Sequence, residues 1–417
     1  MQPGSRIKDP ALAPAGHEKI YWAARHSPVL NAVRDRYLSD GTFDGLSVAV
    51  SLPVEAKTAY LAAVLAEAGA RVSLASPGPF FVQDDVAAAL AERGVEVHAS
   101  SATPPEESDA ELLAVLEMEP DVIVDDRAGL ARLLHTESRD LLPKVRGISE
   151  ETTSGVAKLA AMHAEGVLAV PVIAANDARC KHLFDNRYGT GQSTLTAVMQ
   201  NTNLMLGGKR VVVLGYGWCG KGIARYAAGL GARVTVCEVD PVKGLEAYAD
   251  GHDVLPALAA AEVGEIFITA TGSRDVLAPA HFARMRDGAV LANAGGVDVE
   301  IDVAGLDEMA AERRKVRGEN VEEFALEDGR RLDLVGGGRV VNITAGDGHP
   351  VEIMDLTFAV QALAAHHLAN RRLTETGIHL LPAGIDDRVA ATKLAAVGMG
   401  VDGLSAEQEA FLRSWRD

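Results

Sequence analysis

Short runs of β-branched and other apolar residues alternate with alanine-rich stretches along most of the chain. Strands are expected at 46–51, 69–74, 95–99 and 121–124, and helices at about 55–68, 84–93 and 110–118. The rhythm starts again at Val211 and continues with strands at 234–237, 265–269, 289–292 and 339–341. Alternating strands and helices predict parallel strands with helices on both faces. The pattern therefore predicts an α/β fold with two doubly wound parallel-sheet domains.

The last third of the chain departs from this rhythm in two places. The stretch 300–331 is rich in charge and is expected to form a solvated face or loop. A helix is expected at 355–369, and residues 376–417 are expected to form a short helical segment without a third sheet.

The charge balance excludes two classes of partner. The chain has 40 Lys and Arg against 58 Asp and Glu, a formal charge of −18. An acidic surface repels phosphate backbones and anionic lipids, so we expect neither a nucleic acid nor a membrane as a partner.

Cysteine content and hydropathy narrow the classes further. Three cysteines, Cys180, Cys219 and Cys237, are too few for a disulfide framework or a cysteine-based zinc site, and no metal is expected. The amino-terminal residues lack the apolar core of a signal peptide. The longest strongly apolar stretch, about 166–175, is half a membrane span. A cytoplasmic location is therefore expected.

A glycine motif follows the first strand of the second domain. The apolar run 211–214 leads into Gly215-Tyr-Gly217-Trp-Cys-Gly220, and a helix and a strand are expected after it. In this strand–turn–helix context Gly215 allows a tight turn, Gly217 lets the backbone approach a pyrophosphate, and Gly220 lets the helix pack on the strand. The motif predicts a Rossmann-like dinucleotide site.

An acidic residue indicates which dinucleotide is bound. Glu238 ends the next expected strand, eighteen residues past Gly220. A carboxylate there accepts hydrogen bonds from both hydroxyls of the adenosine ribose and repels a 2′-phosphate. NAD is therefore expected, and Lys243 is the nearby residue that would favour NADP instead.

Several further motifs, taken in order along the chain, closely resemble the S-adenosylhomocysteine hydrolase family. They are Ile148-Ser-Glu-Glu-Thr-Thr-Ser-Gly, Asn176-Asp, Lys181, Phe184-Asp-Asn-Arg-Tyr-Gly, the glycine motif, Thr269-Ala-Thr-Gly and Gly348-His-Pro. The resemblance covers nearly the whole chain. It implies a substrate-binding domain of residues 1–188 and 346–375, an inserted NAD-binding domain of residues 189–345, and a C-terminal helical segment, 376–417. It also implies a homo-oligomer, a tetramer or a dimer.

The resemblance implies a hidden redox cycle on a nucleoside. In the family, NAD oxidises the ribose C3′, the ketone acidifies the C4′ proton, the C5′ substituent is eliminated, water adds, and the ketone is reduced. Lys181 matches the lysine beside the 3′-hydroxyl, and a positive nicotinamide nearby is expected to lower its pKa. Asp185 matches the carboxylate that holds the ribose hydroxyls. The other implied site residues are Asn186, Asp126, Glu151 and His349 for catalysis, and Thr152, Thr153, Ser154, Asn293 and Asn342 for the cofactor.

The chain departs from the family pattern at positions near C5′. The family has His-Met-Thr-x-Glu-Thr where this chain has Pro53-Val-Glu-Ala-Lys-Thr, and Gly-His-Phe-Asp where it has Gly295-Gly296-Val-Asp298. Two histidines are thus replaced by Pro53 and Gly296, which cannot transfer a proton. Two base-contacting positions become Glu55 and Lys57. The family's cofactor-capping Lys- and Tyr-bearing tail is also absent.

Three functions are consistent with this division between retained and lost residues. The favoured one is a divergent nucleoside lyase or dehydratase, which eliminates a C5′ hydroxyl and leaves a 4′,5′-alkene, with Glu55 ahead of His349 as the replacement acid. The second is hydrolysis of S-adenosylhomocysteine with relocated acid and base groups. The third is a catalytically silent NAD-binding regulatory paralogue, which the presence of Lys181 and Asp185 disfavours.

Overall fold

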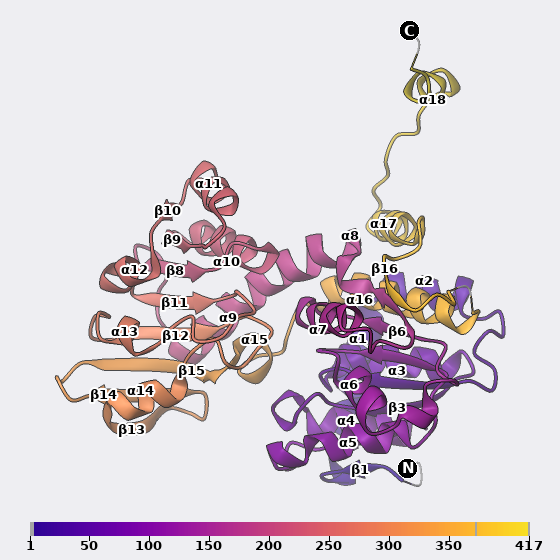
Figure 1. Cartoon of the computed structure of the whole chain (residues 1–417), viewed down its shortest axis with the longest axis horizontal. Helices are drawn as coiled ribbons and strands as arrows, with labels where there is room; N and C mark the ends of the chain where they lie inside the picture. Colours follow the sequence, from indigo (N-terminus) through magenta and orange to yellow (C-terminus); the bar gives the residue numbers. More distant parts are fainter. Residues whose placement is uncertain (1–3, 372, 416–417) are drawn as a thin grey trace.

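The computed structural model describes residues 4–371 and 373–415. The chain forms two lobes, each built around an eight-stranded sheet (Figure 1). The two doubly wound α/β domains expected from the sequence are therefore confirmed.

All strands of the first sheet are parallel, in the order β1-β4-β3-β2-β5-β6-β7-β16. Its strands are β1 (Arg6–Ile7), β2 (Ser47–Ser51), β3 (Arg71–Ala75), β4 (Glu96–Ala99), β5 (Val122–Asp125), β6 (Gly147–Glu150), β7 (Pro171–Ala174) and β16 (Gly377–His379).

The second sheet, in the order β10-β9-β8-β11-β12-β15-β14-β13, is parallel except at one edge, where β13 and β14 run antiparallel to their neighbours. Its strands are β8 (Arg210–Leu214), β9 (Arg233–Cys237), β10 (Asp253–Val254), β11 (Ile266–Thr269), β12 (Ala289–Asn293), β13 (Ala310–Arg317), β14 (Val321–Leu326) and β15 (Arg331–Val340).

Helices cover both faces of each sheet, so each lobe has two apolar clusters, one on either side of its strands. The helices up to β8 are α1 (Ala13–Arg25), α2 (Pro28–Tyr37), α3 (Ala56–Glu67), α4 (Asp84–Glu92), α5 (Ser108–Leu116), α6 (Gly129–Thr136), α7 (Thr153–Ala164), α8 (Arg179–Lys181) and α9 (Thr190–Thr202). The later ones are α10 (Trp218–Gly229), α11 (Pro241–Ala249), α12 (Ala257–Val263), α13 (Pro279–Phe282), α14 (Val303–Met309), α15 (Val341–Thr344), α16 (Val351–Ala369), α17 (Ile385–Ala396) and α18 (Ala406–Arg413). The 3₁₀ turns are η1 (Pro10–Leu12), η2 (Pro79–Phe81), η3 (Pro105–Glu107), η4 (Arg139–Leu141) and η5 (Ala175–Asp177).

Two segments connect the lobes. The first is a helical rod made of α8, the π-helix η6 (His182–Gly189) and α9, which runs from the first lobe to the second (Figure 1). The second is the return from α15 to α16. Helix α16 is apolar on nearly all sides and buried against the first sheet, as expected of a helix in a protein core.

The charged stretch 300–331 is not a loop and is only partly solvent-facing, because Leu306 and Phe324 are buried. It contains most of a β-hairpin in which Arg313 pairs with Glu322, and Arg314 with Glu323, across β13 and β14. Opposite charges across the two strands stabilise the pair, and β13 is exposed and mostly charged, so the hydrophobic pattern gave no signal for β13.

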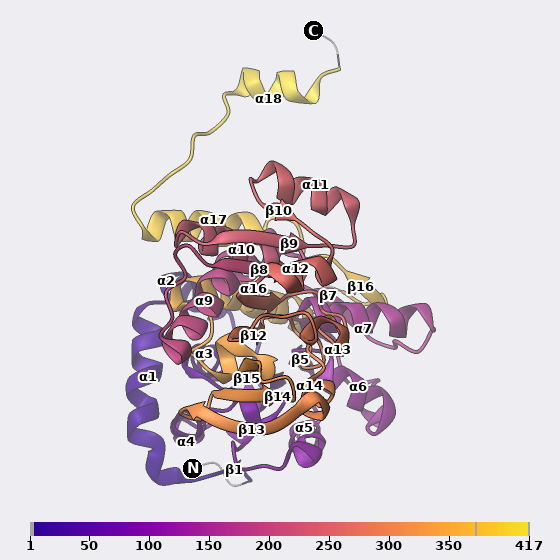
Figure 2. The ribbon, with the colours of Figure 1, turned by 90° about the vertical axis from the view of Figure 1, so that its left-hand side faces the viewer.

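The C-terminal segment is not purely helical. It begins with β16, which extends the first sheet beside β7, and α17 then packs on α2 and α16. Helix α18 stands away from both lobes in Figures 1 and 2. None of the described helices is long and apolar enough to cross a membrane.

Candidate functional site

The site lies where the order of successive strands reverses in each of the two sheets. The chain winds outward on either side of the neighbouring pairs β2/β5 and β8/β11, and ligands of such folds bind beyond the carboxyl ends of the strands at this point. The loops after these four strands carry Pro53, Asp126, Gly215 and Ala270, and all four residues line one cavity of about 1090 Å³. The cavity is therefore shared between the lobes.

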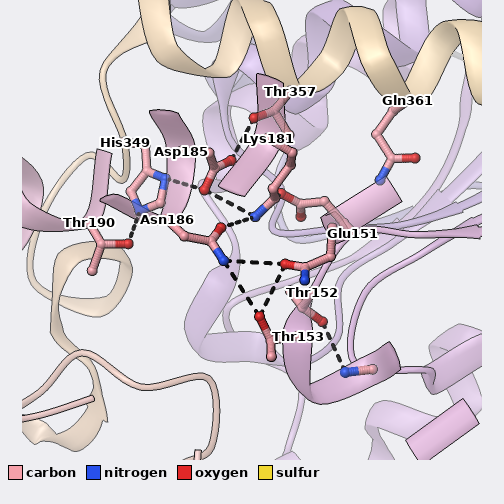
Figure 3. A network of polar contacts seen from close by, with 12 residues as sticks. Glu151, Thr152, Thr153, Lys181, Asp185, Asn186, Thr190, His349, Thr357 and Gln361 are labelled. Atoms are coloured by element: carbon pink, nitrogen blue, oxygen red, sulfur yellow. Dashed lines mark hydrogen bonds and ion pairs between the residues drawn. The ribbon is translucent and has the colours of Figure 1, made fainter. Parts of the chain in front are cut away.

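The helical rod brings the predicted redox residues together (Figure 3). Lys181 Nζ donates to Asp185 Oδ1 at 3.1 Å and to Asn186 Oδ1 at 2.6 Å, and it lies 3.6 Å from Glu151 Oε1. A π-helix winds more widely than an α-helix, so residues four and five positions ahead both face the same side chain. This local irregularity lets one lysine contact both neighbours.

Asp185 is the hub of this cluster. It is buried and accepts a hydrogen bond from Thr357 Oγ1 at 2.7 Å, and His349 Nδ1 lies 3.1 Å from its other oxygen. Burial alone would raise the pKa of Asp185, but Lys181 and His349 outweigh burial and hold that pKa well below its usual range. The structure thus places His349 beside the predicted ribose-binding carboxylate.

The protein groups around Lys181 act on its pKa in the direction opposite to the effect expected of a positive nicotinamide. Burial alone would lower the pKa of Lys181, but the carboxylate of Asp185, joined by Glu151 when that group is ionised, outweighs burial and raises the pKa above its ordinary value. The residues around Lys181 therefore hold it as an ammonium ion, a hydrogen-bond donor and counter-charge. The lowering that a nearby nicotinamide would cause stays a prediction.

Two pairs of adjacent carboxylates follow β5 and β6. The first member of each pair supports the loops: Asp125 accepts from the backbone N–H groups of Leu130 and Ala131, and Glu150 accepts from Ala128 and Thr152. The second members, Asp126 and Glu151, line the cavity.

Asp126 and Glu151 have raised pKa values. Burial, assisted by the nearby carboxylates of Asp185 and Asp126 and opposed by Lys181, raises the pKa of Glu151 to about 8. Burial also raises the pKa of Asp126, whose Oδ1 has no hydrogen-bond partner among the described residues. The site therefore contains one carboxyl group that carries its proton at neutral pH and another with an oxygen free for a ligand.

The glycine motif has the geometry that a dinucleotide needs. Gly215 has φ +99°, and a Cβ there would lie 2.7 Å from the Ala270 carbonyl oxygen. A Cβ on Gly220 would lie 1.9 Å from the Gly215 carbonyl oxygen, so only glycine allows α10 to pack so closely. A Cβ on Gly217, in contrast, would have no atom of another segment within 4 Å, so there is room for a pyrophosphate beside this residue.

All but one of the other cofactor-binding candidates line the cavity. Glu238, Thr152, Thr153, Ser154 and Asn342 line the cavity, as does Lys243. Ser154 Oγ and Asn342 Oδ1 are buried without a partner among the described residues, as expected of atoms that a bound nucleotide would satisfy. These residues fit NAD.

The direct cofactor contact predicted for Asn293 does not fit the structure. Asn293 is outside the cavity lining, accepts from Thr269 Oγ1 and the Gly295 N–H, and donates to two carbonyl oxygens. Its role is to fix the loops after β11 and β12.

Glu55 does not suit the role of replacement acid. Its carboxylate caps α3 by accepting from the N–H groups of Lys57 and Thr58, and it lies 2.7 Å from Lys57 Nζ. Lys57 Nζ also donates to the Asp347 carbonyl at 2.9 Å. Both side chains are buried and line the cavity, so they form a fixed acceptor–donor pair suited to a polar base edge rather than to proton transfer.

Two residues that position the helical rod could not be recognised from the sequence. The carboxylate of Asp386, just inside α17, accepts from the backbone N–H groups of Arg179 and Cys180, both at 2.8 Å, and so caps the rod that carries Lys181. Gly222 lets α10 lie against the same rod, because a Cβ there would be 1.8 Å from the Arg187 carbonyl oxygen. A spacing of more than 200 residues hides the first contact, and Gly222 falls outside the glycine motif.

Within residues 4–371 and 373–415, no cluster of three or more histidine, cysteine or acidic side chains has a geometry suited to a metal ion.

Comparisons with known proteins agree with the site. Residues 4–141 match the family model described as S-adenosyl-L-homocysteine hydrolase, and residues 186–348 match the model of its NAD binding domain. The chain is 50% identical over 412 residues to S-inosyl-L-homocysteine hydrolase of Methanopyrus kandleri, covering 99% of this chain and 97% of that protein. It is 48% identical over 411 residues to adenosylhomocysteinase of Pyrococcus abyssi, covering 98% and 97%, and 48% identical over 402 residues to that of Thermotoga maritima, covering 96% and 99%.

Proposed function

The chain belongs to the S-adenosyl-L-homocysteine hydrolase family and is an NAD-dependent enzyme, and from this premise we propose that it dehydrates a nucleoside. The overall reaction removes the C4′ proton and the C5′ hydroxyl as one molecule of water and leaves a 4′,5′-alkene. Bound NAD supplies the reversible oxidation of C3′ that makes the C4′ proton acidic.

The intact cluster around Lys181 supports the oxidation step. Asp185 accepts hydrogen bonds from the ribose hydroxyls, takes the 3′-hydroxyl proton when C3′ is oxidised and returns it when C3′ is reduced. Asn186 and Asp185 together fix the lysine ammonium. A buried cation beside the 3′-oxygen stabilises negative charge that develops there, and the absence of bulk water strengthens the effect. Each of these groups is already held in place before substrate binds.

The two carboxyl groups that line the cavity support the elimination step. Asp126 has a free oxygen and accepts the C4′ proton, and Glu151 carries a proton at neutral pH and gives it to the departing hydroxyl. After elimination Asp126 carries the C4′ proton and Glu151 is ionised. Transfer of a proton from Asp126 to Glu151 then restores the starting state of both groups. Glu151 thus takes the role that the sequence suggested for Glu55.

The observation that carries the proposal is the pair of positions without a proton-transfer group. Pro53 and Gly296 both line the cavity where the family resemblance implies histidines near C5′. Each such group contributes typically about 10²–10⁴-fold to proton transfer. We therefore expect addition of water or a thiol at C5′ to be slow, so that the alkene leaves as product.

A second candidate is hydrolysis of an S-nucleosylhomocysteine. It is favoured by the full-length similarity to proteins named S-inosyl-L-homocysteine hydrolase and adenosylhomocysteinase. The Glu55–Lys57 pair, an acceptor next to a donor, suits the edge of a purine base in either reaction.

Product analysis separates the two candidates. The NAD-loaded enzyme is incubated in parallel with adenosine, inosine and their S-homocysteine conjugates, and the products are identified by mass spectrometry. A nucleoside product that has lost one water supports dehydration. Release of homocysteine at an ordinary enzymatic rate, about 1 s⁻¹ or more, supports the hydrolase instead.

We also propose that the enzyme is a homo-oligomer. Phe411 and Leu412 of α18 are exposed in a single chain, and α18 stands apart from both lobes (Figure 1). Light scattering of the purified protein tests this, and a monomer at micromolar concentration would contradict it.

A further inference from the structure

A cationic side chain closes one side of the cavity at the boundary between the lobes. Arg127 follows Asp126 in the loop after β5, and its guanidinium lies 4.7 Å from the centre of the Phe81 ring. Arg127 Nη1 also lies 3.7 Å from Asp298 Oδ2, which belongs to the loop after β12 in the second lobe. Arg127, Phe81 and Asp298 thus form a bridge between the lobes, which we call the C5′ gate.

The backbone beneath this gate is strained. Arg127 has φ +58° and Ala128 has φ +56°, and two successive non-glycine residues in the left-handed region are unusual. The surroundings fix this conformation, because the Arg127 N–H donates to Thr152 Oγ1 at 3.0 Å and the Ala128 N–H donates to Glu150 at 3.1 Å. Glycine would adopt the same backbone without strain. We infer that the contacts of the Arg127 side chain with Phe81 and Asp298 offset the cost of the strained backbone.

A second cation contact lies beside the gate. The guanidinium of Arg339, at the end of β15 in the second lobe, lies 3.6 Å from the centre of the Phe80 ring in the first lobe. Phe80 and Phe81 are neighbours on η2, and both line the cavity. Arginine over an aromatic ring is an attractive contact, so both phenylalanines are held by arginines.

The gate faces the C5′ end of a bound nucleoside. Three parts of the cavity lining have other assignments: Glu55 and Lys57 for the base, Lys181 and Asp185 for the ribose hydroxyls, and the glycine motif for the cofactor. In a ribose ring the C5′ substituent points away from the edge that bears the 2′- and 3′-hydroxyls. The lining that remains for it includes Pro53, Phe80, Phe81, Arg127 and Gly296.

We propose that Arg127 is a specificity-determining residue that restricts the C5′ substituent to the size of a hydroxyl group. A C5′ hydroxyl fits inside the closed gate. The longer chain of a homocysteine conjugate must pass between Arg127, Phe81 and Asp298 and separate the ion pair. This proposal rests on the proposed function, since it assumes that the cavity binds a nucleoside in the stated orientation.

If Arg127 instead bound the amino-acid part of a homocysteine conjugate, its removal would change the affinity for the conjugate in the opposite direction. An arginine next to an aspartate also complements the carboxylate and ammonium groups of an amino acid. If Arg127 anchored a homocysteine carboxylate, its removal would weaken binding of the conjugate. If Arg127 closes the gate, its removal strengthens that binding.

The test compares two ligands on three variants of the NAD-loaded enzyme by titration calorimetry. The ligands are a nucleoside and its S-homocysteine conjugate, and the measured quantity is the ratio of their dissociation constants. Arg127→Gly removes the side chain and the strain together, Asp298→Asn weakens the bridge from the other lobe, and Ala128→Gly relieves only the neighbouring strain. Circular dichroism and bound NAD content confirm that each variant is folded.

The gate predicts that Arg127→Gly shifts the ratio towards the conjugate by about tenfold, which corresponds to ~1.4 kcal/mol. Asp298→Asn shifts it in the same direction by a smaller factor, and Ala128→Gly leaves it unchanged. An unchanged ratio in Arg127→Gly, or a shift towards the nucleoside, would overturn the proposal. Because binding is measured, these results do not depend on whether the product is an alkene or a hydrolysed nucleoside.

Discussion

Replacing Lys181 by methionine tests the redox cluster most sharply. Lys181→Met keeps a side chain of similar length and removes the ammonium that faces Asp185 at 3.1 Å and Glu151 at 3.6 Å. Breaking a buried charge pair by removing one partner typically destabilises a protein by about 3–5 kcal/mol. Asp185 keeps its contacts with His349 and Thr357, so we expect the lower end of that range, about 3 kcal/mol.

The same substitution should suppress oxidation of the substrate. Without the cation beside the 3′-oxygen, the first step should slow by about 10²–10³-fold, the usual contribution of one preorganised donor that stabilises developing negative charge. The assay mixes NAD-loaded enzyme with nucleoside and follows the absorbance of reduced nicotinamide, and urea unfolding measures stability separately.

A matched control uses another lysine of the same lobe. Lys144 pairs with Glu119 at 3.2 Å, but the two side chains are 39% and 63% exposed, so Lys144→Met should change stability by less than about 1 kcal/mol and leave oxidation intact. If folded Lys181→Met oxidises substrate at the wild-type rate, the assigned role of Lys181 is wrong.

Three further predictions concern the cofactor and the carboxyl pair. Glu238→Ala should weaken NAD binding by about 1.5–3 kcal/mol, the scale of a charged hydrogen bond, and equal affinities in calorimetry would refute the assignment. Gly220→Ala should lower NAD affinity, because the new methyl group meets a carbonyl oxygen at 1.9 Å, whereas Gly229→Ala on the same helix has nothing within 4 Å and should be neutral or stabilising. Glu151 binds a proton more tightly in the folded state, with its pKa raised from 4.5 to about 8, so wild-type stability should fall as pH rises through that interval. Glu151→Gln should reduce this slope, to which Asp125 and Glu150 also contribute because burial raises their pKa values. Urea unfolding at about pH 5 and pH 8 measures the slope, and an unchanged slope would show that Glu151 does not retain its proton. The same variant should also slow product formation.

Elements with strong local patterns could be predicted from the sequence. Short apolar runs between helical stretches predicted β2, β3, β4, β8 and β9 to within two residues at each end. Strands buried on both faces are continuously apolar, so these runs are easy to find. The three glycines of the nucleotide motif were predicted with their separate roles, because each role requires the absence of a Cβ at a particular place.

Features that depend on tertiary contacts could not be predicted in the same way. No local pattern marks the π-helix that turns Asp185 and Asn186 towards Lys181, or the contact by which Asp386 caps the start of that rod. The hydrogen bonds of Glu55 disfavour the acid role expected for it, for a related reason: the residue lies beside Pro53 in the sequence, but its carboxylate accepts backbone N–H groups at the start of α3. Charge state also depends on the fold, as the raised pKa of Lys181 illustrates.

The most direct test of the central claim is to incubate NAD-loaded enzyme with an unconjugated nucleoside in water enriched in heavy oxygen. The nucleoside pool is then examined by mass spectrometry for loss of water and for label at C5′. Elimination without efficient addition of water predicts that the dehydrated nucleoside accumulates while the remaining substrate stays largely unlabelled. Heavy oxygen at C5′ of the recovered nucleoside, with no dehydrated product, would contradict the account and identify the enzyme as a hydrolase.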